Sequence, residues 1–342
     1  MMPALVTAGW TVGLVVSAGG AAGTPPPFRE QVVVERVILD ARVVDEGGRP
    51  IEGLGVDDFR VTIGGRPARL EAVEWIPGDD PYPEGLPPEH AEAVGAATAP
   101  PGRLIVLFFQ PDHVRERLIG LYRMAPRARE LVAGLNPRDR VAVVTFDAHL
   151  KLHLDFTADR EALDALLRPT VLFQPVDPLP EGKFPSLAAH FPFRAARRAA
   201  SPEVALQILG DALNQIPGSK TLVFFGWGFG RFDRSGVRLG PDYHQARAAL
   251  NRARVTVISL DVTDADFHSL EVAMEQVAYD TGGFYVKTHQ FPGQAVERVV
   301  LALAGRYVLV VERPEDMRGR RTVRVELVGR SGTVMARREL AY

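Results

Sequence analysis

The feature that most constrains the fold is an alternation of short apolar runs with longer helical patterns in the middle of the chain. Strands buried on both faces of a parallel sheet are continuously apolar. Four runs fit that description: Leu104–Phe109, Val141–Phe146, Thr221–Phe225 and Val255–Leu260. Stretches with one apolar side lie between them, near 118–135, 159–167, 202–216, 241–253, 266–280 and 292–304. The alternation predicts an α/β domain with a doubly wound, mostly parallel sheet over 103–312, including a short strand at 284–287.

Two segments of this domain depart from the pattern. In residues 150–156 every second residue is apolar, which predicts a half-exposed strand at an edge of the sheet. His149 and His153 share a face of that strand but lie about 13 Å apart, too far to bind one metal ion, and we expect both to face solvent. Residues 168–200 are rich in Pro, Phe and Arg and predict an inserted loop.

Shorter β segments flank the α/β domain. Alternating apolar residues and two glycine turns predict a small β-module over 31–75. Residues 76–102 are rich in Pro, Gly, Ala and acidic residues, which is typical of a linker. Alternation resumes at 323–327 and returns at 334–338, so we expect a C-terminal β-hairpin within 313–342.

The N-terminus predicts export from the cytoplasm. Residues 2–22 are uncharged and end in small residues, as in a signal peptide, which we place at 1–23. Because no Lys or Arg precedes the apolar run, the alternatives are an uncleaved anchor and a misassigned start codon. No later segment approaches the roughly 20 apolar residues of a membrane span. We therefore expect an extracytoplasmic protein, periplasmic or secreted, with no integral span after removal of the leader.

Charge and cysteine content exclude several classes of protein. The chain of 342 residues has 40 Lys and Arg against 42 Asp and Glu, so it lacks the basic excess of a nucleic-acid-binding protein. It has no cysteine, which excludes disulfides, thiolate nucleophiles and cysteine-ligated metals.

Candidate functional residues follow the ends of the apolar runs, because ligands of open parallel sheets bind beyond the C-terminal ends of the strands. They fall into three groups: Gln110, Asp112 and His113; Trp227 and Phe229 between glycines; and Asp261, Asp264 and Asp266. The three acids are the members of a possible acidic cluster, although such residues commonly cap a helix or solvate a loop.

Four stretches, taken in order, resemble a known family. They are "VVDEGGRPIEGLGVDDFRVTIGGRPARLEAVE" (43–74), "RVAVVTFDAHLKLHLDFTADREAL" (140–163), "VTVISLDV" with "TGGFYV" (255–262 and 281–286), and "RYVLVVERPEDMRGRRTVRVELVGRSGTVMARRELAY" (306–342). Together they resemble the von Willebrand factor type A (VWA) domain proteins, in particular a bacterial secreted subgroup first noted in acidobacteria. The resemblance covers most of residues 31–342.

The resemblance also implies where a metal would bind, and this chain departs from that pattern. VWA domains typically bind Mg²⁺ through an Asp-x-Ser-x-Ser motif, a later Thr and a later Asp, because this hard cation prefers oxygen ligands. The first motif aligns here with Gln110, Asp112 and Val114, and the later Asp aligns with Trp227 or Gly226. Only Thr157 is kept. We therefore expect a degenerate metal site, with Gln110, Asp112 and Thr157 as its remnants and no cofactor. In the simpler interpretation, Asp112 and Thr157 are helix N-caps, and Trp227 covers the strand ends.

The expected function is binding of a protein partner rather than catalysis. The partner-binding face would comprise residues Gln110, Asp112, His113, Thr157, Trp227 and Phe229. A Gly-x-Ser-x-Gly nucleophile motif is absent. Two alternatives remain open: a hydrolase-type enzyme that uses Asp112 and His113 with Asp261 and Asp264, and a cytoplasmic scaffold for an ATPase chaperone.

Overall fold

The computed structural model describes residues 36–78, 102–180, 182–234, 236–313 and 319–340. The predicted signal peptide and most of the predicted linker lie outside these residues.

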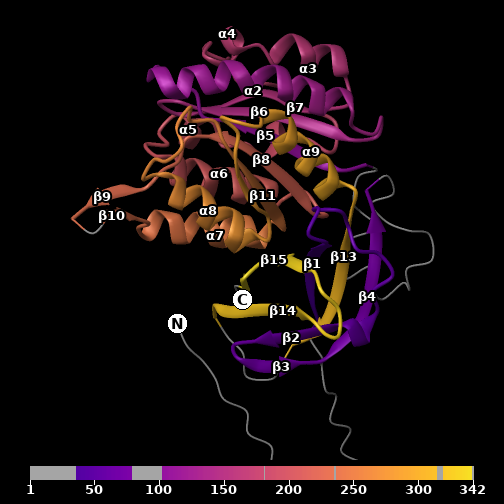
Figure 1. Cartoon of the computed structure of the whole chain (residues 1–342). Coiled ribbons are helices and arrows are strands. Elements are labelled where there is room, and N and C mark those ends of the chain that lie inside the picture. The colour runs from indigo at the N-terminus through magenta and orange to yellow at the C-terminus, as the bar shows by residue number, and fades with distance from the viewer. Residues whose placement is uncertain (1–35, 79–101, 181, 235, 314–318, 341–342) are drawn as a thin grey trace, which may run out of the picture. The chain divides into compact units, whose positions relative to one another are not determined.

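The central element is a six-stranded sheet in the order β12-β11-β8-β5-β6-β7 (Figure 1). Its strands are β5 (Leu104–Phe109), β6 (Arg140–Phe146), β7 (Leu150–Thr157), β8 (Lys220–Gly226), β11 (Val255–Asp261) and β12 (Tyr285–Lys287). All neighbours are parallel except β6 and β7, which are antiparallel. The predicted doubly wound α/β sheet is confirmed, and its strands β5, β8 and β11 are buried along their whole length.

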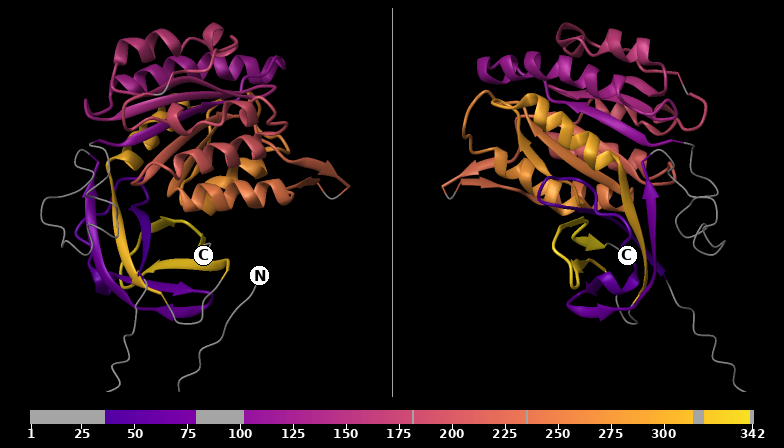
Figure 2. Two further views of the ribbon diagram at one scale, coloured as in Figure 1. Left: turned by 180° about the vertical axis from the view of Figure 1, so that it is seen from behind. Right: turned by 45° about the vertical axis from the view of Figure 1, so that its right-hand side comes forward.

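Helices cover both faces of this sheet (Figures 1 and 2). One face packs against α2 (Arg115–Ala133), α3 (Arg160–Leu166) and α9 (Pro292–Leu303). The other packs against α6 (Pro202–Leu213), α7 (Pro241–Arg252) and α8 (Glu271–Thr281). Proline begins α6, α7 and α9, a position where its missing N–H costs nothing. Gly282, in the left-handed conformation, ends α8.

The inserted segment 168–200 contains short helices rather than only loop. They are α4 (Pro169–Leu172), the 3₁₀ turn η2 (Ala188–His190) and α5 (Phe193–Ala196). Leu187 and Phe191 of this segment join the core cluster that contains residues of β7. This differs from the expected half-exposed edge strand: His153 is 8% exposed and contacts the Thr145 hydroxyl at 2.9 Å. The prediction that His153 faces solvent is therefore wrong, because its ring is buried against Thr145 of the neighbouring strand β6.

Eight further strands form two four-stranded antiparallel sheets around a third core. One sheet has the order β15-β1-β13-β4, with β15 (Thr333–Ala336), β1 (Arg36–Val44), β13 (Gly305–Glu312) and β4 (Leu70–Pro77). The other has the order β16-β14-β2-β3, with β16 (Glu339–Leu340), β14 (Arg321–Leu327), β2 (Phe59–Ile63, after the 3₁₀ turn η1, Val56–Asp58) and β3 (Arg66–Ala68). We call these two sheets the β-sandwich.

The β-sandwich changes the expected domain organisation. Residues 305–312, expected in the α/β domain, pair with β1 and β4 instead. The two C-terminal strands form where expected, but β14 pairs with β2 and β15 pairs with β1, so they are not the two arms of one hairpin. The small N-terminal β-module and the C-terminal strands are therefore parts of one structure, and the α/β domain is inserted between β4 and β13.

A two-stranded ribbon of β9 (Arg231–Asp233) and β10 (Gly236–Arg238) projects from the loop after β8 (Figure 1). No helix in the described part of the chain is both long and apolar enough to cross a membrane.

Candidate functional site

The candidate site lies at the C-terminal ends of β12, β11, β8 and β5, which are neighbours in the sheet and run parallel. The loops that follow these strands are residues 110–114, 227–240, 262–270 and 288–291. We call this set of loops the strand-end face.

Gln110 links two of these loops. Its side-chain Nε2 donates to the Gly228 carbonyl oxygen at 2.8 Å, and its Oε1 accepts from the Trp227 backbone N–H at 3.0 Å. The residue is only 2% exposed. Both ends of the amide are thus engaged within the protein, which contradicts the assignment of Gln110 to a partner-binding surface.

Asp112, Arg117 and Trp227 form one contact group on this face. The Arg117 guanidinium donates to Asp112 Oδ2 at 2.5 Å and lies over the Trp227 ring, 3.6 Å from its centroid. Burial raises the pKa of the Asp112 carboxyl, but the hydrogen bonds from Arg117 and the Val114 N–H outweigh it and leave the pKa below its usual value. Asp112 is therefore an ionised carboxylate held by a guanidinium, and the cation covers the indole.

Asp112 and Thr157 do not cap helices in the expected way. The N-cap residues are Val114 for α2 and Asp159 for α3. Asp112 Oδ1 accepts from the Val114 N–H, and Thr157 Oγ1 accepts from the Asp159 N–H, both at 3.0 Å. Each side chain thus binds the backbone N–H two residues ahead, which fixes the turn before the helix rather than the helix itself.

Thr157 lies at the opposite edge of the sheet from the strand-end face. It ends β7 and pairs with Val141 at the beginning of β6. Because β7 is antiparallel to β6, its C-terminal end lies where the parallel strands start. This contradicts both the grouping of Thr157 with Asp112 in a remnant metal site and its place on the partner-binding face.

Phe229 and His113, both predicted to contact a partner, lie in different surroundings. Phe229 is 3% exposed and packs against the rings of Phe224 and Tyr243, so it belongs to the core and not to a partner-binding surface. His113 is exposed, and its ring stacks on Phe173 with centroids 4.9 Å apart. Of the six residues predicted to contact a partner, Asp112, His113 and Trp227 remain accessible on the strand-end face.

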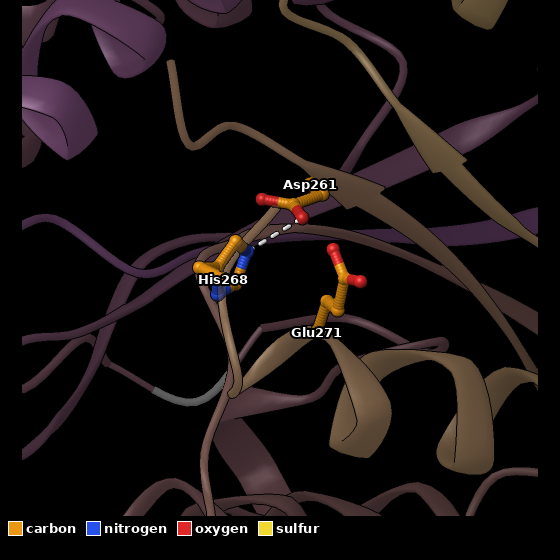
Figure 3. A group of neighbouring side chains, drawn as sticks. All are labelled: Asp261, His268 and Glu271. Atoms are coloured by element: carbon orange, nitrogen blue, oxygen red, sulfur yellow. Dashed lines mark hydrogen bonds and ion pairs between the residues drawn. The ribbon is translucent and has the colours of Figure 1, made fainter. Parts of the chain in front are cut away.

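A second polar group surrounds Asp261 at the end of β11 (Figure 3). Asp261 Oδ2 contacts His268 Nε2 at 2.7 Å and accepts from the Tyr285 hydroxyl at 2.7 Å. Glu271, the first residue of α8, is paired with Lys287 at 2.7 Å. The group therefore contains two carboxylates, an imidazole, a phenol and an ammonium, all from neighbouring elements.

The charge states within this group follow from its contacts. Burial raises the pKa of the Asp261 carboxyl, but hydrogen bonds from His268 and Tyr285 outweigh it and hold the pKa below its usual value. Burial and the hydrogen bond to Asp261 raise the pKa of the Tyr285 phenol. Asp261 thus stays ionised and Tyr285 stays neutral.

Asp261, His268 and Glu271 are the described residues that could hold a metal ion, since one ligand atom from each lies within 4.8 Å of the other two. Each ligand atom already has a protein partner. A divalent ion would need to displace Lys287 from Glu271 and the Tyr285 hydroxyl from Asp261.

The other acids named from the sequence have separate partners. Asp264 pairs with Arg123 of α2 at 2.7 Å, and Asp266, although exposed, contacts His289 at 2.9 Å. Among the described residues, neither Asp112 nor His113 forms a hydrogen bond with Asp261 or Asp264. The structure thus does not bring together the four residues of the hydrolase alternative by direct contact.

Sequence reasoning missed several members of these groups. Arg117 lies five residues after Asp112, just before the helix predicted near 118–135, and only this spacing could have suggested the pair. His268, Glu271 and Tyr285 each lacked a local motif. The exposed Phe232, Phe267 and Phe291 on the strand-end face were also missed, because hydrophobic patterns indicate burial and cannot separate these rings from core residues.

No family model and no curated protein matches the chain. Solved structures of similar arrangement include a von Willebrand factor type A protein from Catenulispora acidiphila, with a TM-score of 0.40, 12% identity, and coverage of 86% of this chain and 74% of that one. They also include the manganese-loaded TRAP protein of Plasmodium vivax, with a TM-score of 0.39, 13% identity, and coverage of 79% of this chain and 96% of that one. An aerotolerance-related membrane protein from Bacteroides fragilis has a TM-score of 0.38 and 12% identity, covering 59% of this chain and 98% of that one. These TM-scores are all below 0.5, so the description of the domain as a doubly wound α/β fold is based on the strand order and pairing of this chain itself.

Proposed function

We propose that this chain is a non-catalytic, extracytoplasmic protein whose VWA-like domain binds a protein partner through the strand-end face, without a metal ion. Because the TM-scores of the solved neighbours are below 0.5 and their identities are low, we base the proposal on this chain's own residues.

The observation that carries the proposal is a set of exposed apolar side chains on four neighbouring loops. The exposed fractions are 45% for Val114, 66% for Phe232, 70% for Phe267 and 58% for Phe291. Each follows a different strand of the parallel sheet, so all four belong to the same edge. Large apolar side chains gathered on one face of a folded domain mark contact sites, and aromatic residues dominate the binding energy of protein interfaces.

Metal independence is supported by the partners of the aligned residues. Mg²⁺ needs several converging oxygen ligands in near-octahedral geometry. The Gln110 amide is engaged by two backbone groups, Val114 has no side-chain oxygen, and Asp112 is paired with a guanidinium that lies over Trp227. A positive charge thus occupies the position beside the one carboxylate, and these residues do not fit a hard cation.

A non-catalytic role is supported by the separation of the candidate groups, since Asp112 and His113 contact Arg117 and Phe173 rather than the Asp261 group. An extracytoplasmic location is supported by the uncharged, small-residue-terminated N-terminal segment. Mass measurement of the native N-terminus tests the location. Cleavage near Ala22 or Gly23 is expected, and an intact Met1 would contradict it.

The binding proposal is tested with surface variants in partner capture from native envelope fractions. Phe267→Ser combined with Phe291→Ser should abolish capture of a protein that the wild type enriches. Tyr122→Ser, on α2 and 49% exposed, is the matched control and should leave capture unchanged. Equal loss in both variants, or no loss in the double variant, would refute the assignment of this face.

Metal independence has its own calorimetric test. Titration of the wild type with Mg²⁺ and Mn²⁺ should show no binding in the micromolar range that depends on Asp112. Micromolar binding that Asp112→Asn removes would overturn this part of the proposal. Binding that Asp261→Asn removes would instead locate a metal at the Asp261 group.

A further inference from the structure

A small cavity lies at the N-terminal edge of the parallel sheet, where the β-sandwich meets the α/β domain. Its volume is about 30 Å³, and Arg42, Arg103 and Arg306 line it together with Ser219 and Thr221. None of the described residues that line it is an Asp or a Glu. It is thus bordered by three cationic side chains from both structural parts, at the edge of the sheet opposite the strand-end face.

Arg42 is a buried cation whose hydrogen-bond partners are neutral. It extends from β1 of the β-sandwich and is 8% exposed. Its guanidinium donates to the Ala302 carbonyl oxygen at 2.9 Å and to the hydroxyls of Thr256 and Thr221 at 3.0 and 3.3 Å. Burial, and then the positive charge of Arg306, lowers the pKa of Arg42 to about 10. The neighbouring cations therefore repel each other in a poorly solvated place.

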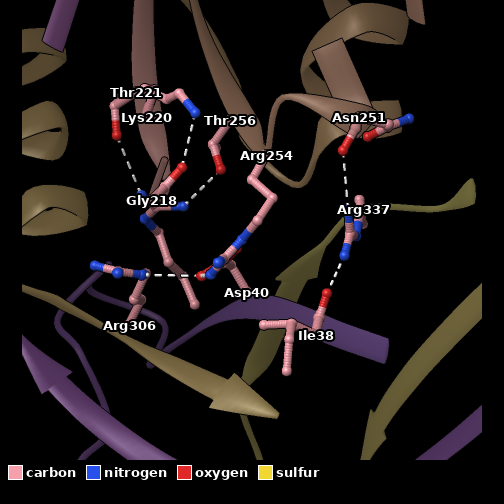
Figure 4. Close-up of polar contacts among 11 residues, drawn as sticks. Ile38, Asp40, Gly218, Lys220, Thr221, Asn251, Arg254, Thr256, Arg306 and Arg337 are labelled. Atoms are coloured by element: carbon pink, nitrogen blue, oxygen red, sulfur yellow. Dashed lines mark hydrogen bonds and ion pairs between the residues drawn. The ribbon is translucent and has the colours of Figure 1, made fainter. Parts of the chain in front are cut away.

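The nearby carboxylates are already shared among arginines (Figure 4). Asp40 lies between Arg254, at 2.8 Å, and Arg306, at 3.0 Å. Burial raises its pKa, but the positive charges of these two arginines outweigh that effect and hold the pKa far below its usual value. Asp139 is engaged by Arg103. Four guanidinium groups thus face two carboxylates, which leaves an excess of positive charge around the cavity.

Arg306 has donors left for a ligand. Its side chain is 9% exposed, and its Nε donates to Asp40. Its two terminal nitrogens form no hydrogen bond with any residue that the structure describes, although they belong to a side chain that borders the cavity. A guanidinium presents its terminal N–H groups as a fork that matches two oxygens of one anion.

We propose that this cavity binds a small inorganic oxyanion, phosphate or sulfate, which joins the β-sandwich to the α/β domain. An anion would satisfy the terminal N–H groups of Arg306 and offset the repulsion between Arg42, Arg103 and Arg306. The size of the cavity sets the class of ligand. One water molecule needs about 10–15 Å³ measured in this way, so a volume of about 30 Å³ suits a compact ion.

The test is a titration of the full-length protein with inorganic phosphate and, separately, sulfate at constant ionic strength, both followed by calorimetry and the phosphate titration also by ³¹P line width. We expect saturable binding of one ion and an increase in Tm that follows the same titration. Arg306→Lys keeps the charge beside Asp40 but removes the fork, and should weaken binding at least tenfold. Arg324→Gln, an exposed arginine on β14, is the control and should leave binding unchanged.

The proposal would be overturned by no saturable binding by the wild type, by equal binding by wild type and Arg306→Lys, or by tighter binding of glycerol 3-phosphate than of phosphate. Ser219→Ala provides a second variant with little risk to folding, and it should also weaken binding. Acetate distinguishes the anion classes, since a planar carboxylate should bind more weakly than the tetrahedral ions. Equal affinity for acetate would refute the assignment to an inorganic oxyanion.

Discussion

Lys220 gives the sharpest test of how the α/β domain is built. It begins β8 and is only 3% exposed. Its ammonium donates to the carbonyl oxygens of Ile216 and Gly218, and among the described residues it has no ion-pair partner. Burial, and then the positive charge of Arg254, lowers the pKa of Lys220 from 10.5 to about 7. The amine should therefore lose its proton in the folded protein near neutral pH.

The sign of the effect on stability follows from proton binding. Between pH 7 and 10.5 the unfolded chain holds a proton on Lys220 that the folded chain has released, so the free energy of unfolding rises with pH in this window. The destabilisation is fully present below pH 7 and is lost as pH rises toward 10.5. The slope reaches about 1.4 kcal/mol per pH unit, which amounts to about 2 kcal/mol between pH 7 and 9.

The assay is denaturant unfolding of the wild type and Lys220→Met at pH 7, 8 and 9, followed by tryptophan fluorescence. Loss of the two hydrogen bonds in Lys220→Met adds an offset that does not depend on pH. The informative quantity is therefore the change with pH in the difference between the two unfolding free energies. We expect the wild type to gain about 2 kcal/mol over the variant across this range. Lys183→Met, at an exposed lysine, is the matched control. A constant difference from pH 7 to 9 would refute the reasoning.

Three further variants test the interior with the same unfolding assay. Burial, and then the charge of Lys151, lowers the pKa of His153 from 6.5 to about 4, so the folded state resists protonation of this ring. The free energy of unfolding of the wild type should therefore fall by about 2 kcal/mol between pH 7 and 5, and that of His153→Gln should not. Phe229→Ala should lower the free energy of unfolding by about 3–5 kcal/mol, because the Phe229 ring packs between the rings of Phe224 and Tyr243. A loss below about 1 kcal/mol would contradict its assignment to the core. Arg254→Met leaves the buried Asp40 with one fewer cation and should cost about 3–5 kcal/mol, whereas wild-type stability would show that Arg306 suffices.

The parts of the fold that could be predicted from the sequence are those with local signals. The strands β5, β6, β8 and β11 are short, continuous apolar runs, and burial on both faces of a parallel sheet produces that pattern directly. The pairing of the outer strands had no such signal. Alternation at 323–327 and 334–338 indicates two strands, but it does not indicate that their partners are β2 and β1, far away in the sequence.

The candidate site was predictable to the same extent. The strand ends placed Asp112 and Trp227 on one face, because parallel strands bring their C-terminal ends together. Thr157 was misplaced because the alternation of apolar and polar residues in an edge strand does not show whether the strand runs parallel or antiparallel to its neighbour. Phe229 was misplaced because a ring on a glycine-rich loop can turn outward or back into the core, and its contacts with Tyr243 became visible only with the structure.

The insertion of the α/β domain between β4 and β13 explains why two opposite edges of one sheet can have different roles. Pro77 at the end of β4 pairs with Gly305 at the start of β13, so the chain leaves the β-sandwich and returns to it at one place (Figure 1). Arg42, through Ala302, and Arg254, through Asp40, join the two parts at the N-terminal edge of the parallel strands. The loops at the C-terminal edge bear none of these joining contacts, and they carry the exposed Phe267 and Phe291. Binding at the two edges should therefore be independent. Arg306→Lys should leave partner capture intact, and the Phe267→Ser, Phe291→Ser double variant should leave phosphate binding intact. Loss of both properties in either variant would show that the edges are coupled through the sheet.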